Sequence, residues 1–150
     1  RLGCMGKRGK QSGIRYGQKK QQGQSDTEQL IAIKRHLKDK HKILAKREPY
    51  LLFKDEKLLS VLDHVKRSQV DRSIEIKNPD LLWIDKYGMW IIEVDGAVHD
   101  RKVEKTRKRN ELFIKNHIKL IVVNLADIKE LGLNIYDYID DQILERIKNG

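Results

Sequence analysis

Residues 78–124 decide the fold, and they have the sequence NPDLLWIDKYGMWIIEVDGAVHDRKVEKTRKRNELFIKNHIKLIVVN. Two apolar runs, 81–84 and 89–95, flank a short loop containing Gly88, which can adopt a positive φ at no steric cost. This pattern predicts a β-hairpin. Residues two apart in a strand share a face, so Glu93 and Asp95 point the same way. Asp80 starts the paired strand at the end where Asp95 leaves it, so we expect the hairpin to bring three carboxylates together.

Three neighbouring carboxylates indicate a bound cation. Like charges at short range resist ionisation unless a cation lies between them. Mg²⁺ is bound by carboxylate oxygens together with water and substrate phosphate, and Mn²⁺ accepts the same ligands. We therefore predict a Mg²⁺ (or Mn²⁺) site formed by Asp80, Glu93 and the backbone carbonyl of Val94. Alternatively, Asp80 is a turn residue after Pro79, and Glu93 is an edge carboxylate paired with a lysine.

The order of these residues resembles that of a nuclease family. Pro79-Asp80, a hairpin and Glu93-Val94-Asp95 are similar to the core motif of the PD-(D/E)XK nucleases. The segment from Glu93 to His99, followed by Glu104-x-x-Arg107 and the apolar run 118–123, resembles the Vsr-like branch. That branch includes very-short-patch repair endonucleases and EDxHD homing endonucleases.

The resemblance covers roughly residues 25–125, and it implies both a fold and an activity. The implied fold is an α/β, restriction-endonuclease-like core, in which helices flank a mixed β-sheet. The implied activity is that of a metal-dependent endonuclease that hydrolyses phosphodiester bonds in DNA.

The resemblance also assigns roles to single residues. Most of the wider family has a lysine where this chain has Asp95, which can only add a ligand or orient a neighbour. Another group must then act on the water or the leaving group. His99 suits general acid–base work, because an unperturbed histidine titrates near neutrality; alternatively it is a loop histidine in solvent, and Lys102 or Lys105 replaces the lysine. Glu28, a helix-cap residue by position, matches the leading glutamate of the EDxHD pattern and would serve near the metal.

Composition favours one folded domain with a polyanionic partner. Of the 150 residues, 39% are hydrophobic, which is enough for a core, and 36% are charged with a formal net charge of +10. This charge predicts nucleic acid rather than a membrane as the partner. No apolar run is long enough to span a bilayer, and no signal-peptide pattern is found. Cys4 is the only cysteine, which excludes an internal disulfide and favours a cytoplasmic, intracellular setting.

Positive charge is concentrated in two segments. Residues 1–24 contain no acidic residue and more than half of the ten glycines, so we predict a flexible arm ahead of a nuclease-like domain at 25–150. The second segment is a helix from about Arg101 to Asn116. Both suit DNA phosphates, although such side chains can also merely solvate a surface. The predicted DNA contacts are Lys7, Arg8, Lys10, Arg15, Lys19, Lys20, Arg101, Lys102, Lys105, Arg107, Lys108 and Arg109.

The other predicted elements would surround the hairpin. They are a helix at 26–40 behind a capping box at 25–28, a strand or buried turn at 50–53, a helix at 58–65, a strand at 70–76, a buried parallel strand at 118–123, and helices at 125–131 and from Asn134 onward. His36 and His117 are expected to be structural.

Other functions stay open on the sequence. The chain could be a DNA-binding module without catalysis, or the nuclease subunit of a transposase or restriction complex. A monomer would more naturally nick DNA, whereas a homodimer would more naturally cut both strands.

Overall fold

The computed structural model describes residues 18–96 and 103–149, and it forms two units, Arg1–Ile33 and Lys34–Gly150. The first unit contains the start of helix α1 (Gln18–His41), in which Leu30 and Ile33 are buried. The helix starts ahead of the predicted capping box, so the segment 25–28 lies inside it and the box prediction is wrong. The run of lysine and glutamine at 18–22 has high helix propensity and extends the helix past that signal.

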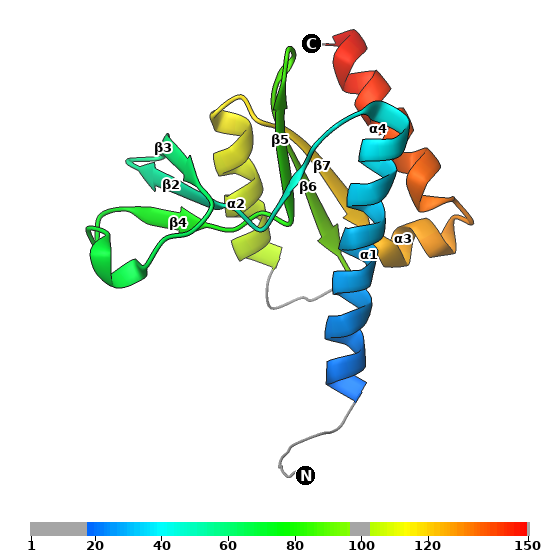
Figure 1. The fold of residues 1–150 in the computed structure, drawn as a ribbon, viewed down its shortest axis with the longest axis horizontal. Helices are drawn as coiled ribbons and strands as arrows, with labels where there is room; N and C mark the ends of the chain where they lie inside the picture. The colour runs from blue at the N-terminus through cyan, green and yellow to red at the C-terminus, as the bar shows by residue number, and fades with distance from the viewer. Residues whose placement is uncertain (1–17, 97–102, 150) are drawn as a thin grey trace. The chain divides into compact units, whose positions relative to one another are not determined.

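The second unit is organised around a four-stranded sheet. Its strands are β1 (Lys46–Arg47), β5 (Leu81–Asp85), β6 (Gly88–Asp95) and β7 (Lys119–Asn124), and they lie in the order β1-β5-β6-β7. β5 pairs antiparallel with both β1 and β6, whereas β6 pairs parallel with β7. The predicted hairpin and the predicted parallel strand are therefore both confirmed (Figure 1).

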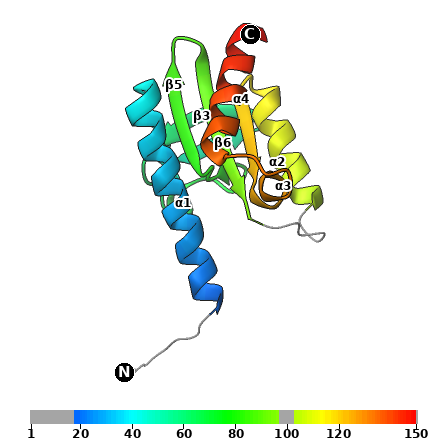
Figure 2. The same cartoon turned by 90° about the vertical axis from the view of Figure 1, so that its right-hand side faces the viewer.

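Helices cover both faces of this sheet. α2 (Val103–Lys115) packs on one face, where Phe113 joins Leu82 and Ile91 in a buried cluster. α3 (Leu125–Glu130) follows β7, and α4 (Ile135–Asn149) packs along β7 on the opposite side from α2 (Figures 1 and 2). The prediction of a mixed sheet flanked by helices is confirmed. No helix in the described ranges is both long enough and apolar enough to cross a bilayer.

A small antiparallel sheet stands beside the main one, and it corrects one prediction. β2 (Tyr50–Lys54) lies between β3 (Lys57–Leu62) and β4 (Glu75–Lys77). The helix predicted at 58–65 is wrong, because Asp55 and Glu56 have φ values of 51° and 66° and form a tight hairpin turn. The strand predicted at 70–76 is confined to β4. Leu58 and Val61 of β3, three residues apart across an irregularity in the pairing with β2, both pack against the cluster beneath α2, so their spacing also fits a helix.

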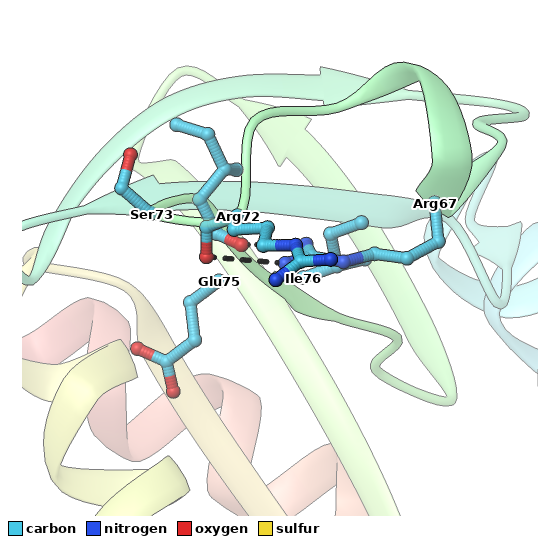
Figure 3. Close-up of a pocket in the computed structure, with 6 residues that line it drawn as sticks. Arg67, Arg72, Ser73, Glu75 and Ile76 are labelled. Atoms are coloured by element: carbon cyan, nitrogen blue, oxygen red, sulfur yellow. Dashed lines mark hydrogen bonds between the residues drawn. The ribbon is translucent and has the colours of Figure 1, made fainter.

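The loop that enters β4 is braced by Arg67. Its guanidinium donates to the backbone carbonyls of Ile74, at 2.6 Å, and Arg72, at 3.2 Å. Residues 72–76 and Arg67 line a pocket of about 380 Å³ (Figure 3). The bonded arginine holds this loop against the edge of the small sheet.

Substitution of Gly88 tests the hairpin turn. Gly88 has a φ of 118°, a backbone conformation that is strained in any residue with a Cβ. The strain does not come from a clash, because the nearest atom to an added Cβ, Lys119 Nζ, would lie 3.5 Å away. We expect Gly88→Ala to lower the free energy of unfolding by about 1–3 kcal/mol in a urea titration. Gly132→Asn is the control, because Gly132 has a φ of 69°, which asparagine tolerates. Equal losses in the two variants would contradict this account.

Candidate functional site

The hairpin register places Asp80 directly opposite Glu93. Leu81 pairs with Ile92 and Leu82 with Ile91, so the antiparallel count continues to Asp80 and Glu93. Directly opposed side chains on one face have Cβ atoms about 5 Å apart. The backbone N–H of Val94 donates to Asp80 Oδ2 at 2.7 Å, which holds the Asp80 carboxylate over the end of β6.

The Glu93 carboxyl group is deeply buried, and burial changes its ionisation. Glu93 is 5% exposed, and it is one of two buried charged residues in the part of the chain that the structure describes. Burial, followed by the charge of Asp80, raises the pKa of Glu93 to about 8, against an opposing effect of Arg109. Burial also raises the pKa of Asp80, although the Val94 N–H counteracts it. Because the pKa of Glu93 is raised to about 8, the pair retains a proton near neutral pH.

Arg109 supplies the positive charge at this pair. Its Nη1 lies 3.4 Å from Glu93 Oε2, and it comes from α2, which packs over the same face of the sheet. The sequence pattern predicts a DNA contact for Arg109 and does not predict this pairing with Glu93. A signal was present, because Arg109 lies four residues before the fully buried Phe113 and therefore shares the inward side of α2.

The site contains two buried polar atoms without a hydrogen-bond partner. These atoms are Glu93 Oε1 and Arg109 Nε, and they are the two found among the described side chains, residues 27–96 and 104–149. An unsatisfied buried polar atom is costly and frequently marks the place of an ion or water. The Asp80 and Glu93 carboxylates, with Glu93 Oε1 unsatisfied, therefore fit a divalent cation that takes oxygen ligands.

The other predicted site residues have different outcomes. Val94 directs its N–H toward Asp80, and the carbonyl of a strand residue points to the same side as its N–H, so a ligand role for that carbonyl is compatible with the strand. Asp95 ends β6 one alternation beyond Glu93, about 7 Å along the strand, and it does not form a group of three close ligand atoms with Asp80 and Glu93. Glu28 is an exposed residue of the first unit. His99 lies outside the described residues.

Only some of the predicted DNA-contacting residues have side chains that the structure describes. Lys105, Arg107 and Lys108 are exposed on α2. Arg107 is already engaged by Glu104 and, at 2.6 Å, by Glu111, so its charge is largely neutralised within the helix. Lys19 and Lys20 belong to α1, but only their backbone is described. Lys7, Arg8, Lys10, Arg15, Arg101 and Lys102 lie outside the described ranges.

A charged pocket adjoins the carboxylate pair through Arg109. It has a volume of about 440 Å³ and lies between α2 and the small sheet. Arg109 and the half-buried Lys77 line it, together with Lys108 and Lys115. Lys77 pairs with Glu75 at 3.2 Å. Glu56, Glu75 and Glu111 line the pocket as well, so its lining carries both signs of charge, with four basic side chains and three acidic ones.

Comparison with known proteins adds no assignment. No protein-family model, curated protein or solved structure matches the chain.

Proposed function

We propose that this chain is a metal-dependent endonuclease that hydrolyses phosphodiester bonds in DNA, built on a restriction-endonuclease-like core. One observation carries the proposal: two opposed carboxyl groups, one of them deeply buried, lie beside an arginine and leave one carboxylate oxygen unsatisfied. Burial of groups that repel each other lowers stability, and such costs are typical of functional sites.

The ligands of the proposed metal are those of the carboxylate pair. Asp80, Glu93 and the Val94 carbonyl would hold Mg²⁺ or Mn²⁺. When bound, the ion would polarise a phosphoryl oxygen and lower the pKa of a coordinated water.

The remaining steps belong to residues of the chain. Glu93 must first release its proton, because a metal ligand has to be ionised. Arg109 would then leave Glu93, donate to a phosphate oxygen of the DNA and neutralise the charge of that phosphate. The water oxygen forms a bond to phosphorus, the bond from phosphorus to the leaving oxygen breaks, and the water's proton passes to a base, for which His99 remains our prediction. The leaving oxygen finally takes up a proton.

The charge of the chain supports DNA as the substrate. The formal net charge is +10, and Lys105 and Lys108 are exposed on the helix that supplies Arg109. Contacts of this kind bind phosphates without regard to base sequence. The same chemistry is consistent with an intracellular, DNA-associated protein.

Plasmid cleavage tests the proposal directly. We expect supercoiled DNA to be nicked or linearised with Mg²⁺ or Mn²⁺, and to stay supercoiled with chelator. Nicked product alone would indicate a monomer, and direct linearisation a dimer. Binding to DNA without cleavage, at several salt concentrations and with either ion, would instead support the DNA-binding module.

The pH dependence of cleavage follows from the Glu93 proton. At subsaturating Mg²⁺ we expect the cleavage rate to rise about tenfold per pH unit as the pH increases from 6 toward 8, because the pKa of Glu93 is raised to about 8 and only the ionised form binds metal. Higher Mg²⁺ should shift the profile to lower pH, since metal and proton compete for the same carboxylate. A profile that does not move with Mg²⁺ concentration would contradict this mechanism.

A further inference from the structure

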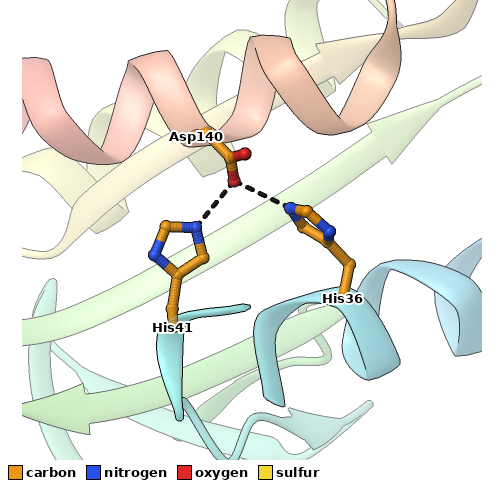
Figure 4. A group of neighbouring side chains, drawn as sticks. All are labelled: His36, His41 and Asp140. Atoms are coloured by element: carbon orange, nitrogen blue, oxygen red, sulfur yellow. Dashed lines mark hydrogen bonds and ion pairs between the residues drawn. The ribbon is translucent and has the colours of Figure 1, made fainter. Parts of the chain in front are cut away.

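A second cluster of titratable side chains lies within the Lys34–Gly150 unit and shares no residue with the carboxylate pair of Asp80 and Glu93. His36 and His41 come from the end of α1, and Asp140 comes from α4. His36 Nε2 lies 2.8 Å from Asp140 Oδ1, and His41 Nε2 lies 2.6 Å from the same oxygen (Figure 4). Asp140 is 6% exposed, and it is the other buried charged residue beside Glu93 among those the structure describes.

The donor atoms in this cluster are those of a transition-metal site. The three ligand atoms all lie within 4.8 Å of one another, and no other such group of histidine, cysteine, aspartate and glutamate occurs in the described residues. Tetrahedral Zn²⁺ with bonds of about 2.0–2.1 Å separates its ligand atoms by about 3.3 Å. To admit the ion between them, the His36 nitrogen would need to recede from Asp140 Oδ1 by about 0.5 Å and the His41 nitrogen by about 0.7 Å.

The two oxygens of Asp140 have different partners. Oδ1 receives both histidines, whereas Oδ2 is held by Lys40 Nζ at 2.6 Å. Burial acts to raise the pKa of Asp140, but the hydrogen bonds from His41, Lys40 and His36 outweigh it and lower that pKa to about 2. Oδ1 is directed at the histidines, while Lys40 orients the carboxylate from behind.

The surroundings also restrict the histidine rings. The His36 ring packs against Tyr136 with centroids 4.9 Å apart, and it meets the His41 ring edge to face at 5.9 Å. The His36 and His41 side chains are 20% and 18% exposed. The cluster is thus largely preorganised, but solvent still reaches it, as entry of an ion requires.

We propose that His36, His41 and Asp140 form a site for Zn²⁺ or a related first-row transition-metal ion, which ties the end of α1 to α4. Three protein ligands leave the fourth position of a tetrahedron for water. Two imidazoles favour Zn²⁺ over Mg²⁺, so this site and the carboxylate pair of the hairpin select different ions. Without a metal, the same residues form only an ion-paired clamp between the helices.

Zinc titration of the full, chelator-treated chain separates a metal site from a clamp. We expect one Zn²⁺ per chain by competition with a chromophoric chelator, and a higher unfolding temperature with Zn²⁺ than with EDTA. His36→Gln and His41→Gln should each weaken zinc binding by about 100-fold. Loss of a residue that only supports a metal ligand can cost that much, and loss of a ligand itself should cost no less. His64→Gln is the matched control, because His64 is exposed and its ring meets the Tyr50 ring edge to face at 6.0 Å.

Two further outcomes decide the proposal. Glu93→Gln should retain the zinc, which would place the ion away from the carboxylate pair, and Co²⁺ substituted for Zn²⁺ should give the absorption bands of a tetrahedral site without a thiolate band from Cys4. The proposal is overturned if the wild-type chain binds no stoichiometric Zn²⁺, or if the His64 variant loses as much affinity as the His36 and His41 variants. The wild-type titration decides even if one of those variants does not fold.

Discussion

Glu93→Gln and Asp80→Asn should each lower the rate of Mg²⁺-dependent plasmid cleavage by at least about 1,000-fold. Both substitutions keep the size of the side chain and remove its negative charge. A metal ion stabilises charge in the transition state by several kcal/mol, and each 1.36 kcal/mol corresponds to a factor of ten in rate. Cleavage at saturating Mg²⁺, measured in single turnover, checks this expectation.

The controls for this result are carboxylates of the same type elsewhere on the chain. Glu130→Gln and Asp127→Asn change exposed residues of α3 and should leave the rate within about twofold of wild type. DNA affinity should also stay within about threefold in the Glu93 and Asp80 variants, because they remove no positive charge. Cleavage by Glu93→Gln within tenfold of wild type would remove Glu93 from the proposed metal site.

The second large effect is on stability, and it has the opposite sign. Glu93→Gln should raise the free energy of unfolding by about 2 kcal/mol at pH 8. The pKa of Glu93 is raised from 4.5 to about 8 in the folded chain. Between these pH values the folded chain holds a proton that the unfolded chain has lost, so wild-type stability falls as the pH rises through this window. Glutamine does not ionise and avoids that loss.

We expect less than the full effect of the pKa shift because Glu93→Gln also removes the partner of Arg109. Urea unfolding at pH 5, 6.5 and 8 measures the trend: the difference between variant and wild type should be smallest at pH 5 and largest at pH 8. Glu130→Gln, which alters an exposed side chain, should show no such trend. A Glu93→Gln chain that is less stable than wild type at pH 8 would show that the buried carboxylate is not under strain.

A gain in stability together with a loss of cleavage would distinguish a functional carboxylate from a structural one. A structural carboxylate contributes to the folded state, and its removal lowers stability. A carboxylate that serves to bind a cation destabilises the cation-free protein, and its removal relieves that cost. The unfolding free energy and the cleavage rate are therefore two independent tests of the role of Glu93.

Local chain chemistry is sufficient to predict much of the main sheet and one part of the candidate site. The turn at Gly88 and the apolar runs on either side of it set the register of the hairpin, and that register alone places Asp80 opposite Glu93. The dense β-branched run before Asn124 likewise predicts β7, because a strand covered on both faces needs apolar side chains throughout. These features depend on neighbours in sequence, and local patterns record them.

Contacts between distant segments required the tertiary structure. Apolar spacing at 58–62 fits a helix as well as a strand, and pairing of β3 with β2 selects the strand. The spacing from Phe113 places Arg109 on the inward side of α2, but only the packing of that helix brings it to Glu93. His36 and Asp140 are separated by 104 positions, and no local pattern in either helix indicates their contact. Periodicity and turn chemistry report which face of an element is buried, but only the packing of elements determines which side chains meet there.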